Sequence, residues 1–217
     1  MRLLSRLLLS LSVLLPMACS AASPPADFQE GTHYGKVREV QVPLDAKRIE
    51  VDEFFWYGCP HCYHLDPTVD AWRAHKPADV DFVRIPNSLG RPEGILHSKA
   101  FYTAEVLNLG EKIHKPLFAA IHEQHQMLVT QPDLQAFFTA QTGVLPDVFN
   151  STFTGFAVGT RVNKAESMAK TYGVASVPTL VVGGKYVTNV GMGGTPEQTF
   201  KIVDFLIEKV RQERKGK

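Results

Sequence analysis

The sequence of 217 residues has few cysteines, almost no net charge and no long apolar run after its first residues. Three cysteines are too few for a small secreted scaffold held by several disulfides. A formal net charge of +1 gives no overall field that would attract nucleic acid, so no nucleic-acid partner is expected. Hydrophobic residues make up 44% and charged residues 21%, an ordinary globular composition that argues against a disordered, collagenous or polytopic membrane protein.

The first 22 residues have the order of a secretory signal peptide. They contain no acidic residue, carry Arg2 and Arg6, continue with an apolar run at residues 7–15 and end in small residues after Pro16. The run is too short to cross a bilayer as a permanent helix. Cleavage after Ala22 would leave 195 residues, enough for one sizeable core or one domain with an insertion. The pattern predicts export.

Cys19 leaves a second processing route open. It could be the lipidated first residue of a bacterial lipoprotein, which would anchor the protein in a membrane. The usual lipobox has Leu three residues before the cysteine, whereas this chain has Pro16 there. Because the small-residue pattern before Ala22 is intact, the soluble route is favoured.

Hydrophobic periodicity predicts an α/β domain interrupted by helices. Strands are expected at residues 34–42, 49–57, 80–85, 179–182 and 185–188, with helices at residues 59–74 and from Pro196 onward, the latter capped by Thr195. Residues 94–172 instead show apolar residues at helical spacing and no convincing strand. The expected division is a signal peptide at 1–22, an α/β domain at 23–93 and 173–217, and a helical insertion at 94–172.

Cys59-Pro60-His61-Cys62 is the most informative motif. A structural zinc site needs four ligands, and the chain has no second cysteine pair, so no metal is expected. An inert structural disulfide explains the motif poorly, because so short a loop constrains the unfolded chain little. Thiol–disulfide exchange explains it well.

The position of Cys59 at a helix start predicts an acidic thiol. Unpaired N–H groups and the helix dipole stabilise a thiolate there, Pro60 suits the first turn, and His61 adds a donor and, when protonated, a charge. Cys62, further into the helix, is expected to be shielded and to act as the resolving thiol. A Cys59 pKa of ~4 would stabilise the dithiol form by roughly 4 kcal/mol at pH 7 and make the disulfide more oxidising by about 90 mV.

Three segments resemble the DsbA family of bacterial periplasmic disulfide oxidoreductases, itself a known example of an acidic CxxC thiol. Residues 53–63, EFFWYGCPHCY, resemble the family's strand and active site. Val177-Pro178 resembles its cis-proline pair, and residues 182–186, VGGKY, resemble its hairpin. More than a hundred positions separate Cys62 from Pro178, which is room for the helical domain that this family inserts into a thioredoxin-like fold.

The resemblance implies an enzyme that donates its Cys59–Cys62 disulfide to newly exported proteins through a mixed disulfide at Cys59. It implies a thioredoxin-like fold with an inserted helical domain, and no cofactor beyond the redox-active disulfide. It also implies a periplasmic monomer whose disulfide is restored by a DsbB-like, quinone-linked membrane oxidase.

Glu53 is the first site residue outside the motif. The resemblance implies that it lies buried beneath Cys62 and relays the proton of that thiol, whereas strand alternation could instead point it to solvent. Asp66, one helical turn beyond Cys62, could assist.

Val177, Pro178 and Met192 are expected to form the substrate side of the site. The resemblance implies a cis Pro178 against Cys59, with the backbone of Val177 free to pair with an extended substrate. Met192, in a loop expected to be flexible at residues 191–194, could line the active-site rim.

Other histidines and phenylalanines are expected to be structural. Solvated helix faces are expected for His75, His97, His114, His122 and His125, and core positions for Phe137, Phe138 and Phe153.

Two other functions remain open. A disulfide isomerase or reductant would be kept reduced in the same compartment, and a thioredoxin-like binding module would hold unfolded chains with incidental cysteines. The Pro60-His61 pair favours the oxidant, because His can stabilise the thiolate. The lack of an obvious separate dimerisation domain weighs against a dimeric isomerase.

Overall fold

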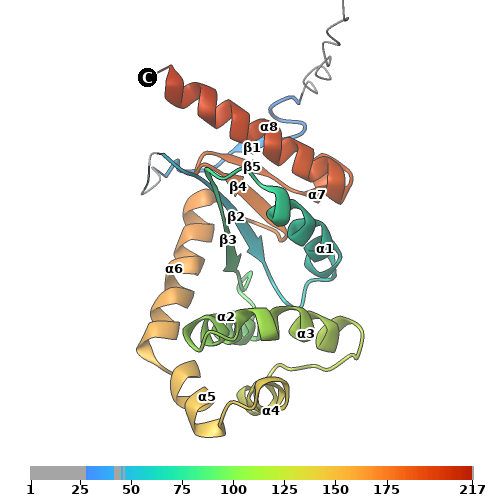
Figure 1. The fold of residues 1–217 in the computed structure, drawn as a ribbon, viewed down its shortest axis with the longest axis vertical. Coiled ribbons are helices and arrows are strands. Elements are labelled where there is room, and N and C mark those ends of the chain that lie inside the picture. The colour runs from blue at the N-terminus through green and yellow to red at the C-terminus, as the bar shows by residue number, and fades with distance from the viewer. Residues whose placement is uncertain (1–27, 42–44, 46, 217) are drawn as a thin grey trace, which may run out of the picture.

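The computed structural model describes residues 28–41, 45 and 47–216, which form a mixed sheet at one end and a group of helices at the other (Figure 1). The strands are β1 (Gly35–Lys36), β2 (Ile49–Phe55), β3 (Val80–Pro86), β4 (Thr179–Val182) and β5 (Tyr186–Thr188). They lie in the order β1-β5-β4-β2-β3. The pair β2–β3 is parallel and is connected by α1 (Pro60–His75), while the other neighbouring strands are antiparallel.

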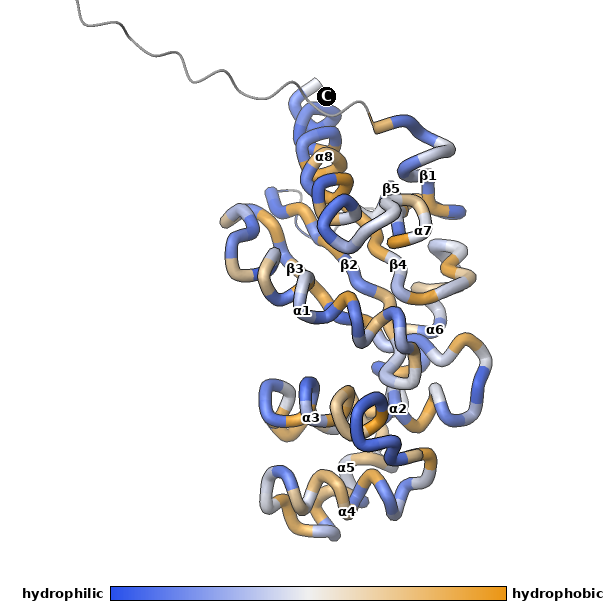
Figure 2. The backbone as a smooth tube through the Cα atoms, turned by 90° about the vertical axis from the view of Figure 1, so that its right-hand side faces the viewer, coloured by the Kyte–Doolittle hydropathy of each residue, from blue (hydrophilic) through white to orange (hydrophobic). Residues whose placement is uncertain are grey.

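The two faces of the sheet are covered by different helices. Val51 and Leu180 belong to a core shared with α1 and α8 (Pro196–Lys215), whereas Phe54 and Val181 pack with residues of α6 (Phe156–Tyr172). This division follows from strand alternation, which sends successive side chains of β2 to opposite faces. Along α8, hydrophobic residues recur between hydrophilic ones, as expected for a helix with one buried face (Figure 2).

The helical group consists of α2 to α5, and α6 connects it to the sheet (Figure 1). Its helices are α2 (Pro92–Val106), α3 (Gly110–His122), α4 (Gln131–Thr142) and α5 (Pro146–Phe153). Phe137, Phe138 and Phe153 are buried there, as the sequence predicted. The same core includes Cys59 and Cys62, so the cysteine motif lies where the helical group meets the sheet. The predicted fold, a thioredoxin-like α/β fold with inserted helices, is confirmed.

Several predicted boundaries differ from the structure. The strand expected at residues 34–42 is limited to Gly35–Lys36, and the strand expected to reach residue 57 ends at Phe55. The loop expected at residues 191–194 is mostly a short helix, α7 (Val190–Gly193), because the side chain of Asn189 caps it by accepting a hydrogen bond from the Met192 N–H at 3.0 Å. The cap of α8 is confirmed, since Thr195 Oγ1 accepts from the Gln198 N–H at 3.1 Å.

The expected signal peptide, its cleavage site and Cys19 lie outside the described residues. Among the helices of residues 28–216 that the structure describes, none combines the length and the apolar character needed to span a bilayer.

Asp52 is a carboxylate buried in the face of β2 that α6 covers. It is fully buried, and neither of its oxygens has a hydrogen-bond partner among the described residues. Burial, reinforced by the neighbouring Glu50, raises the pKa of Asp52 well above its ordinary value. A group whose pKa is raised by folding destabilises the folded protein increasingly as pH rises above the pKa of the unfolded chain.

We therefore expect Asp52→Val to stabilise the protein, by about 2 kcal/mol near pH 8 and by less near pH 5. Urea unfolding of the reduced protein at the two pH values measures this difference. Asp81→Val is the matched control, because Asp81 lies on the neighbouring strand in an ion pair with Arg48 and should gain nothing from the substitution. A lower free energy of unfolding for Asp52→Val at pH 8 would contradict this account of Asp52.

Candidate active site

Cys59 occupies the N-cap of α1, and Pro60 follows in the first turn. The Tyr63 N–H donates to the Cys59 carbonyl at 3.1 Å, which closes the first helical turn. Cys62 lies within that turn and is only 1% exposed, whereas Cys59 is 8% exposed. Both cysteines are free thiols in this structure. The predicted placement of the pair, with the first cysteine more accessible than the second, is confirmed.

The Cys59 thiol is acidic for physical reasons that the structure makes explicit. A hydrogen bond from the Cys62 thiol, helped by the N–H groups of Cys62 and His61 and by the charge of His61, lowers the pKa of Cys59 to about 6 against the opposing effect of burial. The shift is smaller than the expected one. At pH 7 it stabilises the dithiol form by only about one pKa unit, about 1.4 kcal/mol, which corresponds to roughly 30 mV. This stabilisation is complete above the pKa that Cys59 has in the unfolded chain, and it is lost as pH falls through about 6, the pKa of Cys59 in the folded protein.

Cys62 and Glu53 form the buried half of the site. Burial is the main cause that raises the pKa of Cys62, and the proximity of Cys59 and Glu53 adds to it. Glu53 is 3% exposed, and burial raises its pKa to about 7, although Arg84 acts in the opposite direction. Glu53 is thus buried, as the resemblance implied. With a pKa of about 7, its carboxyl group can both accept and release a proton near neutral pH.

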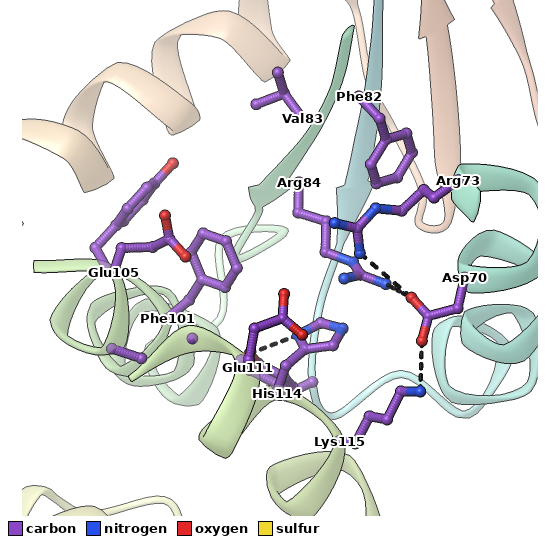
Figure 3. A pocket seen from close by; sticks show the side chains of 14 residues that line it. Asp70, Arg73, Phe82, Val83, Arg84, Phe101, Glu105, Glu111, His114 and Lys115 are labelled. Atoms are coloured by element: carbon purple, nitrogen blue, oxygen red, sulfur yellow. Dashed lines mark hydrogen bonds and ion pairs between the residues drawn. The ribbon is translucent and has the colours of Figure 1, made fainter. Parts of the chain in front are cut away.

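Arg84 is a site residue that the sequence reading missed. Its guanidinium lies 3.3 Å from Glu53 Oε2, 2.5 Å from Asp66 Oδ1 and 3.1 Å from Asp70 Oδ1. It borders a cavity of about 530 Å³ between β3, α1 and the inserted helices (Figure 3). Asp66, expected to assist Cys62, lies against this arginine. No charge pattern in the sequence indicated Arg84, because β3 reaches Glu53 only through its pairing with β2.

Val177 lies beside Cys59 although the two are 118 positions apart. The Val177-Pro178 peptide bond is cis, and the Cys59 Sγ–H donates to the Val177 carbonyl oxygen at 3.5 Å. Pro178 is buried and Val177 is half-buried. Met192 is half-buried in α7. The arrangement places a cis-proline backbone next to the acidic thiol.

Three histidines of the inserted helices contact the two residues after β2, Trp56 and Tyr57. The Trp56 Nε1–H donates to His97 Nδ1 at 2.9 Å, the Tyr57 hydroxyl pairs with His114 Nδ1 at 2.9 Å, and His122 Nε2–H donates to the Tyr57 carbonyl at 2.7 Å. His97 and His114 are buried and His122 is half-buried, so the expectation of solvated faces is wrong for them. The spacing of apolar residues along α2 and α3 does not show that these histidines pack against Trp56 and Tyr57, which are distant in the sequence. His75 is exposed on α1, as expected, whereas His125 is exposed but lies beyond the end of α3 and so belongs to no helix face.

Comparison with models of known protein families identifies the family of this chain. The model of the DSBA-like thioredoxin domain matches residues 50–202. The chain belongs to this family.

Relatives named thiol:disulfide interchange protein DsbA match nearly the whole chain. The thiol:disulfide interchange protein DsbA of Pseudomonas aeruginosa is 41% identical over 207 residues, which cover 94% of this chain and 96% of the relative. The DsbA of Burkholderia cepacia is 37% identical over 98% of this chain and 99% of the relative. The crystal structure of P. aeruginosa DsbA matches with a TM-score of 0.81 and 40% identity, over 87% of this chain and 97% of that one.

Proposed function

We propose that this thiol:disulfide oxidoreductase of the DSBA-like family oxidises newly exported proteins by donating a Cys59–Cys62 disulfide. The observation that carries the proposal is the asymmetry of the two thiols: the pKa of the more accessible Cys59 is lowered to about 6, and that of the buried Cys62 is raised. A thiolate that is stable at Cys59 makes that sulfur the better leaving group, which favours release of an oxidised client.

The exchange proceeds in two balanced steps. A client thiolate attacks Cys59 Sγ, the Cys59–Cys62 bond breaks, and the sulfur of Cys62 receives the electron pair and then a proton from Glu53. A second client thiolate attacks the client sulfur of the mixed disulfide, and Cys59 leaves as a thiolate. The client loses two electrons and the enzyme gains them. In this scheme Pro60 shapes the helix start, and His61 stabilises the thiolate.

Val177, Pro178 and Met192 are proposed to face the client. The Val177 carbonyl, already within 3.5 Å of Cys59 Sγ, is well placed to accept a hydrogen bond from an extended client segment once the thiol is ionised. Pairing through the backbone tolerates many client sequences. Pro178 brings neither an N–H nor a polar side chain to the thiolate, and Met192 offers an adaptable apolar contact.

The partners and location in this proposal rest on the family resemblance and on the N-terminal sequence pattern. Reduced exported polypeptides are the clients, and a DsbB-like quinone-linked membrane oxidase restores the disulfide. The N-terminal pattern and the family support a periplasmic location, where we propose a soluble monomer, with anchoring through Cys19 as the alternative. We also propose the division at residues 23–93, 94–172 and 173–217 as that of the functional units.

The test of this function is to mix the enzyme, with its Cys59–Cys62 disulfide formed, with an equal amount of a reduced, unfolded client and to measure oxidation of the client. We expect one client disulfide for each enzyme molecule, together with two new enzyme thiols. The double variant Cys59→Ser/Cys62→Ser should give no oxidation, because it has no disulfide that could accept the two electrons of the client. Full activity in the double variant would identify a binding module instead. Reshuffling of wrong disulfides without net oxidation would identify an isomerase.

A further inference from the structure

Arg84 is shared by three carboxylates, and this sharing connects the inserted helices to the chemistry of Cys62. The arginine side chain is only 11% exposed and contacts Glu53, Asp66 and Asp70 at 3.3, 2.5 and 3.1 Å. One guanidinium carries one positive charge, so a carboxylate that loses its other partners draws the arginine more strongly. The contact between Arg84 and Glu53 has the longest distance of the three. Its strength therefore depends on which other groups bind Asp66 and Asp70.

Two consecutive residues of α3 hold these aspartates. His114 Nε2 lies 3.0 Å from Asp66 Oδ1, and Lys115 Nζ lies 2.6 Å from Asp70 Oδ2. In Figure 3, Lys115 reaches one carboxylate oxygen of Asp70 from α3, while Arg84 reaches the other. The inserted helices thus supply one donor to each carboxylate that competes with Glu53.

His114 acts as a neutral donor. An ionised Asp66 can only accept hydrogen bonds, so the proton of His114 lies on Nε2 and its Nδ1 accepts from the Tyr57 hydroxyl at 2.9 Å. Burial lowers the pKa of His114, which keeps the ring neutral near pH 7. Its hydrogen bond to Asp66 is therefore maintained across the neutral range.

We propose that His114 and Lys115 are positioning residues for the proton transfer between Glu53 and Cys62, because they hold Asp66 and Asp70 and so leave Arg84 available to Glu53. The inference rests on the proposed function and adds a role for α3 in it. Neither residue contacts a sulfur atom; each acts through an aspartate and Arg84.

The surroundings of Glu53 restrict which groups can transmit such an effect. The charged and titratable groups that face it are Arg84 from β3, Cys62, Asp66 and Arg73 from α1, and Tyr57 from the turn after β2. Among these, Arg84 is the one that contacts the Glu53 carboxylate. A change in α3 therefore reaches Glu53 through Arg84.

His114→Leu is the first test. It removes the donor to Asp66, so Arg84 is drawn toward Asp66 and Glu53 becomes harder to ionise. We expect the pH midpoint for resolution of a Cys59–glutathione mixed disulfide by Cys62 to rise by about half a pH unit or more. His114→Gln, whose amide N–H can donate to Asp66, should return the midpoint toward that of the wild type. A merely structural role would lower the rate at every pH without moving the midpoint.

Lys115→Met is the second test, and it does not depend on a buried side chain. Lys115 is 69% exposed, so the variant should fold normally. Loss of its charge leaves Asp70 more dependent on Arg84, and the midpoint should rise in the same direction but by less. The matched control is Lys112→Met, at an exposed position one turn earlier on α3, for which no shift is expected.

A carbon-13 NMR titration of the Glu53 carboxyl group in the reduced protein gives the direct reading. Its midpoint should rise in His114→Leu and Lys115→Met and remain near the wild-type value in His114→Gln and Lys112→Met. Unmoved or lowered midpoints in the first two variants would overturn this inference alone. A wild-type resolution rate that is independent of pH across the Glu53 titration would instead overturn the proton role of Glu53 in the proposed function.

Discussion

Cys62→Ser is expected to accumulate mixed disulfides with client proteins in the exporting cell. The variant keeps the acidic Cys59, whose pKa is lowered chiefly by the neighbouring residue 62 and the backbone N–H groups at the helix start. The Cys59 thiolate can attack a disulfide already present in a client, which gives a mixed disulfide and releases one client thiolate. Serine at position 62 can still donate a hydrogen bond to Cys59 but cannot displace the client, so the adduct persists. Oxidation of clients should fall at least 100-fold, in line with the loss of a catalytic group. Non-reducing gels of cell extracts, with and without a reductant, measure the adducts.

Cys59→Ser is the matched variant for this experiment. It should form no adducts, because the remaining Cys62 is 1% exposed and its pKa is raised by burial. Adducts that form through Cys62 in Cys59→Ser, and are absent from Cys62→Ser, would reverse the assigned roles of the two cysteines.

Glu53→Gln is expected to stabilise the protein while slowing its chemistry. Folding raises the Glu53 pKa from 4.5 to about 7, so wild-type stability is lost as pH rises from the unfolded to the folded value. Removing the ionisable group should raise the free energy of unfolding by about 2 kcal/mol at pH 8 and have little effect at pH 4.5, the full shift being offset in part by the lost pairing with Arg84. Urea unfolding at both pH values measures this.

The same variant should slow proton exchange with Cys62. Resolution of the Cys59–glutathione mixed disulfide at pH 7 is expected to fall by about 100-fold, because the amide cannot accept the proton of Cys62. Glu208→Gln, at an exposed position of α8, is the control for a simple loss of a carboxylate. Unchanged resolution in Glu53→Gln would leave Glu53 as a structural group only.

The sequence was sufficient to predict the helices and strands that depend on interactions between near neighbours in the chain. The run of Val and Phe before Cys59 predicted β2, and the Cys59-Pro60 pair predicted the start of α1, because strand propensity and helix capping act between near neighbours. The same holds for the cap at Thr195, where a short side chain bonds an N–H three residues away. The burial of Glu53 and the proximity of Val177 to Cys59 came from the family resemblance instead.

Contacts between distant segments were not predictable in this way. Arg84 reaches Glu53 because β3 pairs with β2 in register, and neither residue's neighbours in the sequence indicate that pairing. His97 and His114 are polar residues on helices of mixed composition, so spacing favoured a solvated face, whereas the aromatic segment at Trp56 and Tyr57 buries them. The unpartnered Asp52 is likewise visible only once α6 is known to cover its strand face.

The most direct test of the account is a pH titration of the Cys59 thiolate in the reduced protein, followed by its ultraviolet absorbance and by the rate of alkylation. We expect a single ionisation at about pH 6 that disappears in Cys59→Ser, with Cys62 unreactive throughout the range. Ionisation of Cys59 near its ordinary value of 9.0, or earlier reaction of Cys62, would contradict the claim that the helix start and the buried partner thiol make Cys59 the exchanging sulfur.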